Sequence, residues 1–404
     1  MAYLDSISAS VPEFGGYFLD GERNLVVYVT DTTMFAKARL VVAAEITQHK
    51  IRDKVGEYRP RIILRQADFS FGQLQGWADA ISDNVTGSVA GVVSSGVDIS
   101  SNRVRIGVTP SQRESATLAV TQSLTTLGIP PAAVTFENEE NQVSGPATDL
   151  LGATLLRRRA HAISKDLDSE LRETLHLTTT LSSYPFNPWL GAVQLDGNKG
   201  CTGTLAVDYT PSGGVTHRYI MMASHCTKLW ASVSSPPDTT YQGGGVTILG
   251  TESFDPPEPR YSDMALFLVN PSAAVPRGVI ARTFLDGGNT NIDASNPPTS
   301  VVWHVSSEVV GNYVTKVGAA TGWTSGYIDA INQTKVGDDL HTRYGTTSAN
   351  FGDDEGDSGG PVFYPESGDR ADFEGIAWGK IQPNVRNPPN LPRWLLQPAE
   401  RDSN

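Results

Sequence analysis

The stretch FGDDEGDSGGPVF, residues 351–363, decides how the rest of the sequence is interpreted. Ser358 stands between Asp357 and two glycines, and Pro361 and an apolar pair follow at once. Glycine costs stability in a helix or strand because it loses more backbone freedom on folding than any other residue. Glycines are therefore expected where the main chain must approach another group closely or aim its N–H groups at one point. A nucleophilic serine with an oxyanion hole is one such place.

The composition is that of an ordinary soluble globular protein, and it argues against two classes of partner. The 404 residues are 39% hydrophobic and 19% charged, enough chain for two or three domains with cores of their own. The formal net charge of −13 argues against a nucleic-acid backbone or an anionic membrane surface. No stretch reaches the roughly 18 unbroken apolar residues of a membrane helix. The first twenty residues lack the basic start and apolar region of a signal peptide.

Residues 1–145 alternate strand-like and helix-like segments, which predicts an α+β domain without catalytic features. Pro110 leads into Ser111-Gln-Arg-Glu114, a capping-box pattern that predicts a helix start, and Gly128 with Pro130 ends that helix. The other predicted elements are strands in 24–30, 59–69 and 132–137, helices in 34–46 and 71–85, and a hairpin of 89–100 with 102–108.

Residues 146–183 have the composition of a connector, and residues 184–404 that of an all-β domain. The connector contains the run Arg157-Arg158-Arg159, which is either a solvated helix face or part of an exposed segment open to proteolytic processing. From about residue 184, short apolar runs recur every 8–15 residues between Gly, Pro, Asn and Asp. This rhythm is typical of a β-sandwich or β-barrel.

A serine hydroxyl needs a base to remove its proton and a third group to orient that base. None of the seven histidines follows Ser358, which excludes the serine–acid–histidine chain order of the G-x-S-x-G hydrolases. His225 is the best candidate base. In the segment YIMMASHC (219–226) it stands at the end of an apolar run, and Cys226 follows it. Asp263 precedes the apolar run MALFLV, where it is either the orienting carboxylate or a simple turn residue.

The chain has two cysteines, Cys201 and Cys226. They are either two unrelated buried thiols or a disulfide that pins the backbone next to His225. A disulfide closing this loop of about 25 residues contributes roughly 3.5 kcal/mol in the chain-entropy model. It also implies an oxidising compartment.

The motifs CTGTL, MMASHC, SDMALFLV, GDSGGPVF and GIAWG resemble, in this order, those of the chymotrypsin/trypsin-fold serine peptidases. The resemblance covers about residues 184–380 and implies two six-stranded β-barrels with the active site between them. It implies His225 as general base, Asp263 as its partner and Ser358 as nucleophile, with no metal and no cofactor. The remaining implied residues are the oxyanion donors Gly356 and Ser358, the substrate-binding residues Gly352, Ala377, Trp378 and Gly379, and the disulfide Cys201–Cys226.

The segment KVGAATGWTSGYI (316–328) is similar to the GRTTG region of the bacterial α-lytic protease and streptogrisin branch, and residues 1–145 resemble the propeptides of that branch. Three departures stand out: Asp354 replaces an expected cysteine, Ala377 a serine that bonds the catalytic aspartate, and Ala319 an arginine that pairs with the aspartate before the nucleophile. Asp357 therefore needs another partner, namely Lys316, a new chain N-terminus or a cluster of donors.

These observations predict a serine endopeptidase made as a proenzyme and exported to the extracellular space, although the chain shows no signal peptide. Its expected partners are protein or peptide substrates and its own N-terminal domain, which acts as intramolecular chaperone and inhibitor. No nucleic acid or membrane partner is expected. The alternative is a protease-like protein that binds partners without cleaving them, which the alanines at 319 and 377 favour.

Overall fold

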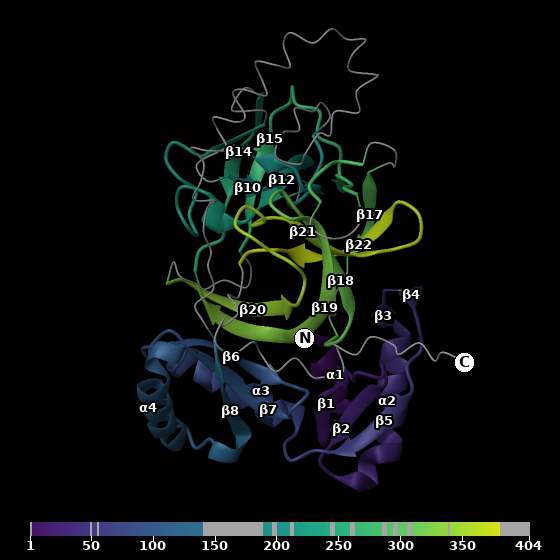
Figure 1. Cartoon of the computed structure of the whole chain (residues 1–404), viewed down its shortest axis with the longest axis vertical. Coiled ribbons are helices and arrows are strands. Elements are labelled where there is room, and N and C mark those ends of the chain that lie inside the picture. Colours follow the sequence, from purple (N-terminus) through teal and green to yellow (C-terminus); the bar gives the residue numbers. More distant parts are fainter. Residues whose placement is uncertain are drawn as a thin grey trace, which may run out of the picture.

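In the computed structural model, the N-terminal and C-terminal halves of the chain meet along strands β6 and β19 (Figure 1). Within the described residues, no helix is both long and apolar enough to cross a membrane. The connector predicted over 146–183, with its arginine run and processing site, lies outside these residues. The structure describes residues 2–48, 51–54, 56–139, 189–195, 200–210, 214–242, 247–258, 263–284, 289–293, 298–304, 309–337 and 340–379.

The N-terminal half contains the helices and strands predicted from the sequence, and also a helix and a strand within residues 2–19 and two short strands within 52–57 that were not predicted. In α3, the residues Phe71, Leu74, Ala78 and Ile81 recur at helical spacing and are all buried. The β2 segment LVVYV is rich in β-branched side chains, which favour an extended backbone. The helices are α1 (Ala2–Ser10), η1 (Thr32–Met34), α2 (Phe35–Gln48), α3 (Phe71–Asn84), η2 (Pro110–Gln112), α4 (Arg113–Thr126) and η3 (Pro131–Ala133), and the strands are β1 (Phe14–Leu19), β2 (Leu25–Val29), β3 (Arg52–Asp53), β4 (Gly56–Glu57), β5 (Ile62–Gln66), β6 (Val92–Asp98), β7 (Arg103–Val108) and β8 (Val134–Asn138).

The capping box predicted at Ser111 and Glu114 is wrong. Helix α4 begins one residue before Glu114 and has no side-chain cap. Pro110 starts the short 3-10 turn η2, which takes up Ser111 and moves the α-helix start beyond it. A capping box is instead present at α3, where the side chains of Ser70 and Gln73 accept hydrogen bonds from each other's backbone N–H groups.

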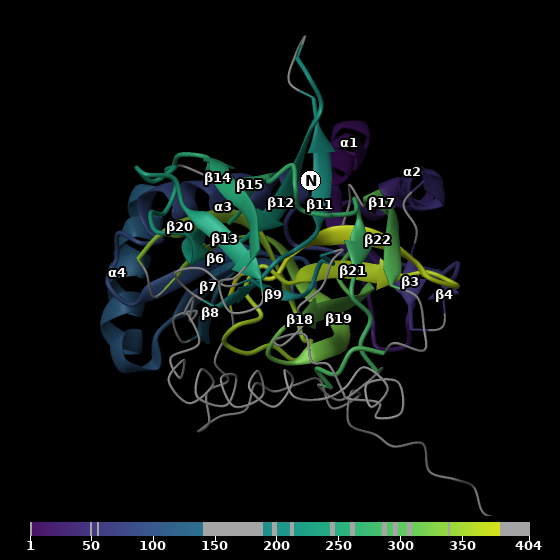
Figure 2. The same ribbon diagram turned by 90° about the horizontal axis from the view of Figure 1, so that it is seen from above.

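The regular elements described in the C-terminal half are strands, apart from the 3-10 turn η4. Five of them form an antiparallel sheet in the order β11-β12-β15-β14-β13, and Figure 2 shows β12, β14 and β15 apart from β18, β19 and β22 of the second sheet. The elements are β9 (Gln194–Leu195), β10 (Cys201–Thr202), β11 (Ala206–Tyr209), β12 (His217–Met222), η4 (Ser224–Cys226), β13 (Thr239–Gln242), β14 (Thr247–Phe254), β15 (Ala265–Val269), β16 (Val279–Ile280), β17 (Thr299–His304), β18 (Tyr313–Gly318), β19 (Gly322–Val336), β20 (Thr342–Ala349), β21 (Pro361–Pro365) and β22 (Arg370–Ile376).

The expectation of two closed six-stranded barrels needs correction, because the sheets formed by the described strands stay open. The five-stranded sheet ends at β11 and β13. The second sheet follows the order β16-β17-β22-β21-β18-β19-β6-β7-β8, with β20 paired to β19. Strand β19 is 15 residues long, so its far end pairs with β6 of the N-terminal half. The sheet therefore continues into the N-terminal half.

Ion pairs at two places are among the contacts that join the halves. At the β6–β19 pairing, Lys335 Nζ lies 2.8 Å from Glu139 Oε1. At the other, Arg52 of β3 is buried and donates to Asp372 (2.6 Å) and Glu374 (2.5 Å) of β22. A buried ion pair that loses one partner costs about 3–5 kcal/mol, so both contacts hold the halves in a fixed relation.

Candidate active site

The structure brings the predicted base and its predicted carboxylate into direct contact. Strand β12 ends at Met222, and the 3-10 turn η4 then carries His225, which faces Asp263, two residues before β15. His225 Nδ1 lies 2.8 Å from Asp263 Oδ2, and the His225 backbone N–H donates to Asp263 Oδ1 at 3.0 Å. Both side chains are almost fully buried. The histidine ring is thereby held in one orientation by its neighbour's carboxylate.

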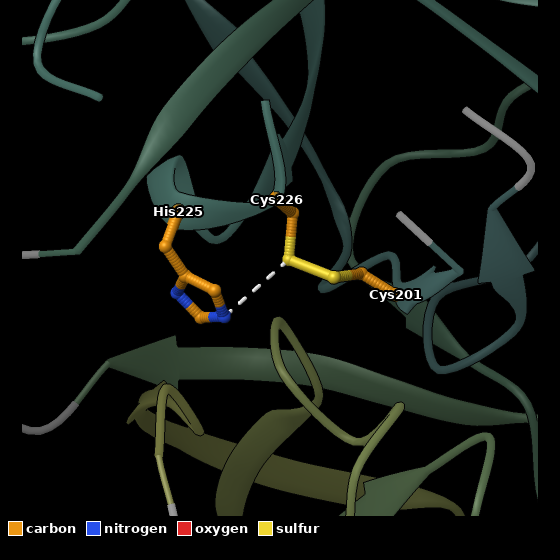
Figure 3. Close-up of side chains that lie close together, drawn as sticks. All are labelled: Cys201, His225 and Cys226. Atoms are coloured by element: carbon orange, nitrogen blue, oxygen red, sulfur yellow. Dashed lines mark hydrogen bonds between the residues drawn. A yellow bond between two sulfur atoms is a disulfide. The ribbon is translucent and has the colours of Figure 1, made fainter. Parts of the chain in front are cut away.

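The predicted disulfide between Cys201 and Cys226 is confirmed. It ties η4 to the short strand β10, and the Cys226 sulfur lies 3.7 Å from His225 Nε2 (Figure 3). The two cysteines and His225 lie close enough together to resemble a metal site. Because both sulfurs are in the disulfide, neither is available as the thiolate that a metal needs.

The loop that carries Ser358 packs against the same strand, β10. The Thr202 N–H donates to the Ser358 carbonyl oxygen at 2.8 Å, and the Thr202 hydroxyl donates to the Gly356 carbonyl oxygen at 2.7 Å. The disulfide and these bonds join the serine loop to the histidine turn through β10. In the described part of the chain, the Ser358 hydroxyl makes no hydrogen bond, so its bond to His225 is not formed in this structure.

The glycines around Ser358 have the conformations that the sequence leads us to expect. Gly356 (φ +99°) and Gly359 (φ +90°) lie in the left-handed region that favours glycine. A Cβ at Gly359 would also collide with the Thr202 carbonyl oxygen. Among the described residues, the N–H groups of Gly356 and Ser358 donate no hydrogen bond, which leaves them available to a ligand oxygen.

Asp357 is held by Lys316 and by a cluster of donors, two of the partners that the sequence offered. Lys316 Nζ lies 2.5 Å from Asp357 Oδ2, and both side chains are closed to solvent. Oδ1 accepts the N–H groups of Ala320 and Thr321, and Oδ2 accepts the Thr321 hydroxyl and the Asp354 N–H. Burial alone would raise the pKa of Asp357, but the Lys316 charge and these bonds hold that pKa below its ordinary value.

Asp353 shares the same lysine. Its Oδ1 atom is 3.3 Å from Lys316 Nζ, an ion-pair contact without hydrogen-bond geometry. Burial raises the pKa of Asp353 to about 7, since the charge of Asp357 adds to the effect of burial and the attraction of Lys316 offsets only part of it. A carboxyl group that titrates near neutrality therefore follows Gly352 in the loop before Ser358.

The four predicted substrate-binding residues lie on two segments next to this loop. The Gly352 carbonyl oxygen accepts the Thr324 hydroxyl at 2.5 Å. Ala377 exchanges backbone bonds with the serine loop: its N–H donates to Gly360 and its carbonyl oxygen accepts from Gly359. Trp378 and Gly379 follow it directly.

Arg343, which no sequence pattern predicted, also binds Asp263. Its Nε atom donates to Asp263 Oδ2 at 2.8 Å, and its guanidinium lies over the rings of Trp230 and Trp378. The segment HTRYG that contains it has no pattern that marks a buried arginine, and Asp263 lies 80 residues away in the sequence. The one signal in the sequence was Ala377 in place of the expected serine, because it left the Asp263 carboxylate in need of another donor.

No family model and no curated relative matches the chain. Solved structures similar to it include protease A of Thermobifida fusca (22% identity over 45% of this chain and 79% of that one, TM-score 0.31) and a Nocardiopsis protease (22%, 45% and 80%, TM-score 0.33). A glutamic-acid-specific serine protease matches at 23% identity over 48% and 91%, with a TM-score of 0.33. These are bacterial serine proteases of the chymotrypsin fold, the class whose motifs the sequence resembles. At these TM-scores and identities the likeness carries no argument about activity, which rests on the geometry of the site.

Proposed function

We propose that the protein is a serine endopeptidase that acts through His225, Asp263 and Ser358. The observation that carries the proposal is the buried His225–Asp263 pair, tied through the disulfide and β10 to a glycine-rich serine loop. With the imidazole hydrogen on His225 Nδ1 and donated to Asp263, Nε2 is the basic nitrogen that takes a proton. Burial, which raises the pKa of Asp263, is outweighed by the charges and hydrogen bonds of His225 and Arg343, so the net pKa lies well below the ordinary value.

The proposed reaction has two halves. In acylation, Ser358 Oγ attacks the peptide carbonyl carbon while His225 Nε2 takes the hydroxyl proton and then delivers it to the leaving amine. In deacylation, His225 Nε2 takes a proton from the water that attacks the acyl carbonyl carbon, and then gives it to Ser358 Oγ as the bond from that oxygen to the acyl carbon breaks and the acid product forms. The backbone N–H groups of Gly356 and Ser358 would stabilise the oxyanion in both halves, and one such donor typically supplies about 3–4 kcal/mol.

The absence of a Ser358–His225 bond is compatible with this mechanism. Catalytic hydrogen bonds are often long or poorly aligned without substrate and tighten in the complex. The segments that carry the two residues are both bonded to β10, one through the disulfide and the other through Thr202.

We further propose that the N-terminal half is a propeptide-like domain of a proenzyme, followed by a connector and the protease domain. Its docking through Arg52 and through the β6–β19 pairing supports a specific intramolecular partner. The disulfide supports export to an oxidising compartment. Protein or peptide chains are the proposed substrates, and Gly352, Ala377, Trp378 and Gly379 are the proposed residues that line their site.

A protease-like binding protein is the second candidate, favoured by Ala319 and Ala377. Lys316 and Arg343 weigh against it, because they take over the contacts that an alanine cannot make. Lys316 pairs with Asp357, and Arg343 donates to Asp263.

Hydrolysis of a mixed peptide library by the full-length protein tests the proposal. We expect cleavage by the wild type, none by Ser358→Ala, and unchanged thermal melting of that variant, since only one hydroxyl is lost. Cleavage by Ser358→Ala at the wild-type rate would remove this serine from the mechanism. Absence of any cleavage by the wild type after the connector has been cut would favour the binding protein.

A further inference from the structure

Arg343 is a fully buried cation in the second sheet that reaches across to the histidine side of the site. It lies on β20, where its register partner on β19 is Lys335. Its guanidinium carbon is 4.3 Å from the ring centre of Trp230 and 4.4 Å from that of Trp378. Trp230 follows the turn η4, and Trp378 follows β22. Two indole rings from different segments therefore fix the plane of one guanidinium.

The single hydrogen bond from Arg343 Nε ends on a particular oxygen. Asp263 Oδ2 accepts it at 2.8 Å, and the same oxygen faces His225 Nδ1 at 2.8 Å. The other oxygen, Oδ1, accepts the His225 backbone N–H. All donors around Asp263 Oδ2 thus come from two side chains, one neutral or cationic and one always cationic.

We propose that Arg343 is a positioning residue of this site: it fixes the Asp263 carboxylate and offsets part of its negative charge, and so sets the pH below which His225 no longer acts as base. The inference rests on the function proposed above and adds to it a residue outside the triad. An imidazolium is stabilised by the neighbouring carboxylate, and a guanidinium on the same oxygen opposes that stabilisation. Arg343 therefore extends activity toward lower pH.

The distances give the size of the effect. Arg343 Nε and His225 Nδ1 are each 2.8 Å from one oxygen, so they lie at most about 5.6 Å apart. A unit charge at that distance, with an effective dielectric constant of about 20–40, shifts a titration by roughly one to two pH units.

The other charged groups near His225 are engaged in bonds of their own. Asp255 Oδ2 accepts the Ser224 hydroxyl at 2.8 Å. Glu258 accepts the Trp230 indole N–H and lies 2.8 Å from His341 Nδ1. Lys228, in the loop after η4, pairs with Asp238 at 3.2 Å. Asp263 binds the imidazole directly, and Arg343 binds the same carboxylate oxygen.

Two substitutions separate charge from packing. Arg343→Gln keeps an N–H donor for Asp263 and removes the charge, whereas Arg343→Lys keeps the charge and loses the planar fork between the indoles. Arg218→Met is the matched control, because Arg218 Nε also donates to an aspartate, Asp208, but at the far end of β12. Each change is made in the full-length protein.

The primary measurement is the acid limb of kcat/KM against pH. We expect Arg343→Gln to move this limb up by roughly one to two pH units, Arg343→Lys to leave it near the wild-type position, and Arg218→Met to have no effect. Equal displacement in the lysine and glutamine variants would overturn the proposal, as would a glutamine limb within about 0.3 unit of the wild type. If Arg343→Gln does not fold, Arg343→Met replaces it with the same expectation. If neither Arg343→Gln nor Arg343→Met folds while Arg343→Lys does, the positive charge at this position serves folding alone, and the proposal is overturned.

A second readout does not depend on hydrolysis. The titration of the His225 ring, followed by NMR of labelled histidine in a Ser358→Ala background, should move up by the same interval when Arg343→Gln is added. An unmoved titration contradicts the role of Arg343, whereas an inactive wild type with a moved titration contradicts only the proposed peptidase activity.

Discussion

The Lys316→Met substitution tests the electrostatic support of the serine loop. Lys316 Nζ contacts Asp357 Oδ2 at 2.5 Å and Asp353 Oδ1 at 3.3 Å, with Lys316 and Asp357 closed to solvent. Methionine has a similar stem but no charge, so two buried carboxylates would face each other without a cation. Removing one partner of a buried pair typically costs about 3–5 kcal/mol. At roughly 2–4 °C per kcal/mol, the melting temperature should fall by about 6–20 °C.

The assay is thermal melting followed by tryptophan fluorescence, with peptide hydrolysis measured in parallel. Lys228→Met is the matched control, because Lys228 pairs with Asp238 but is 44% exposed, and exposed pairs contribute about 0–1 kcal/mol. Adding Asp357→Asn to Lys316→Met should recover part of the lost stability, since the uncompensated charge disappears. Equal, small losses in the Lys316 and Lys228 variants would refute the reasoning.

Three further predictions address pH, the disulfide and the N-terminal half. The Asp353 carboxyl has a pKa of about 7 in the folded state and near 4 when unfolded, so its contribution to stability is complete below about pH 4 and is lost as pH rises through about 7. The melting temperature should therefore fall over this pH range, and Asp353→Asn should flatten the fall. An unchanged fall in the variant would contradict this role of Asp353. Reduction of the disulfide should lower melting temperature and activity together, and an active, equally stable reduced protein would count against its role at His225. Residues 184–404 should refold poorly alone, because their strands pair over long sequence distances. Adding residues 1–150 as a separate chain should raise the yield of folded protease, and the same fragment should then inhibit its peptide hydrolysis. Arg52→Ala in that fragment should weaken the inhibition by roughly 100- to 4,000-fold, and equal inhibition by both fragments would exclude Arg52 from the docking.

The sequence predicted those features that depend on short motifs. The pairing of His225 with Asp263 and the bond between the two cysteines followed from residues placed at recognisable positions along the chain. Lys316 was among the partners anticipated for Asp357, because the absence of an arginine at 319 left a buried carboxylate in need of a donor.

Features that depend on distant pairing could not be predicted in this way. The β6–β19 junction joins strands more than 200 residues apart, and nothing in either strand specifies its partner. The same holds for Arg52 with Asp372, and for Arg343 with Asp263. Barrel closure was expected from the resemblance, yet it depends on which sheet edges meet, and in this chain β19 pairs with β6 of the N-terminal half.

The central claim is that Ser358 is an activated nucleophile, and covalent labelling by a fluorophosphonate probe tests it most directly. The probe phosphorus bonds to the serine oxygen only where a base removes the hydroxyl proton and an oxyanion hole receives the phosphoryl oxygen. The account predicts one label per protein molecule, located on the peptide containing Ser358 by mass spectrometry, and none on Ser358→Ala or His225→Ala. A folded wild-type protein that stays unlabelled after the connector has been cut, or that carries its label on another residue, would contradict it.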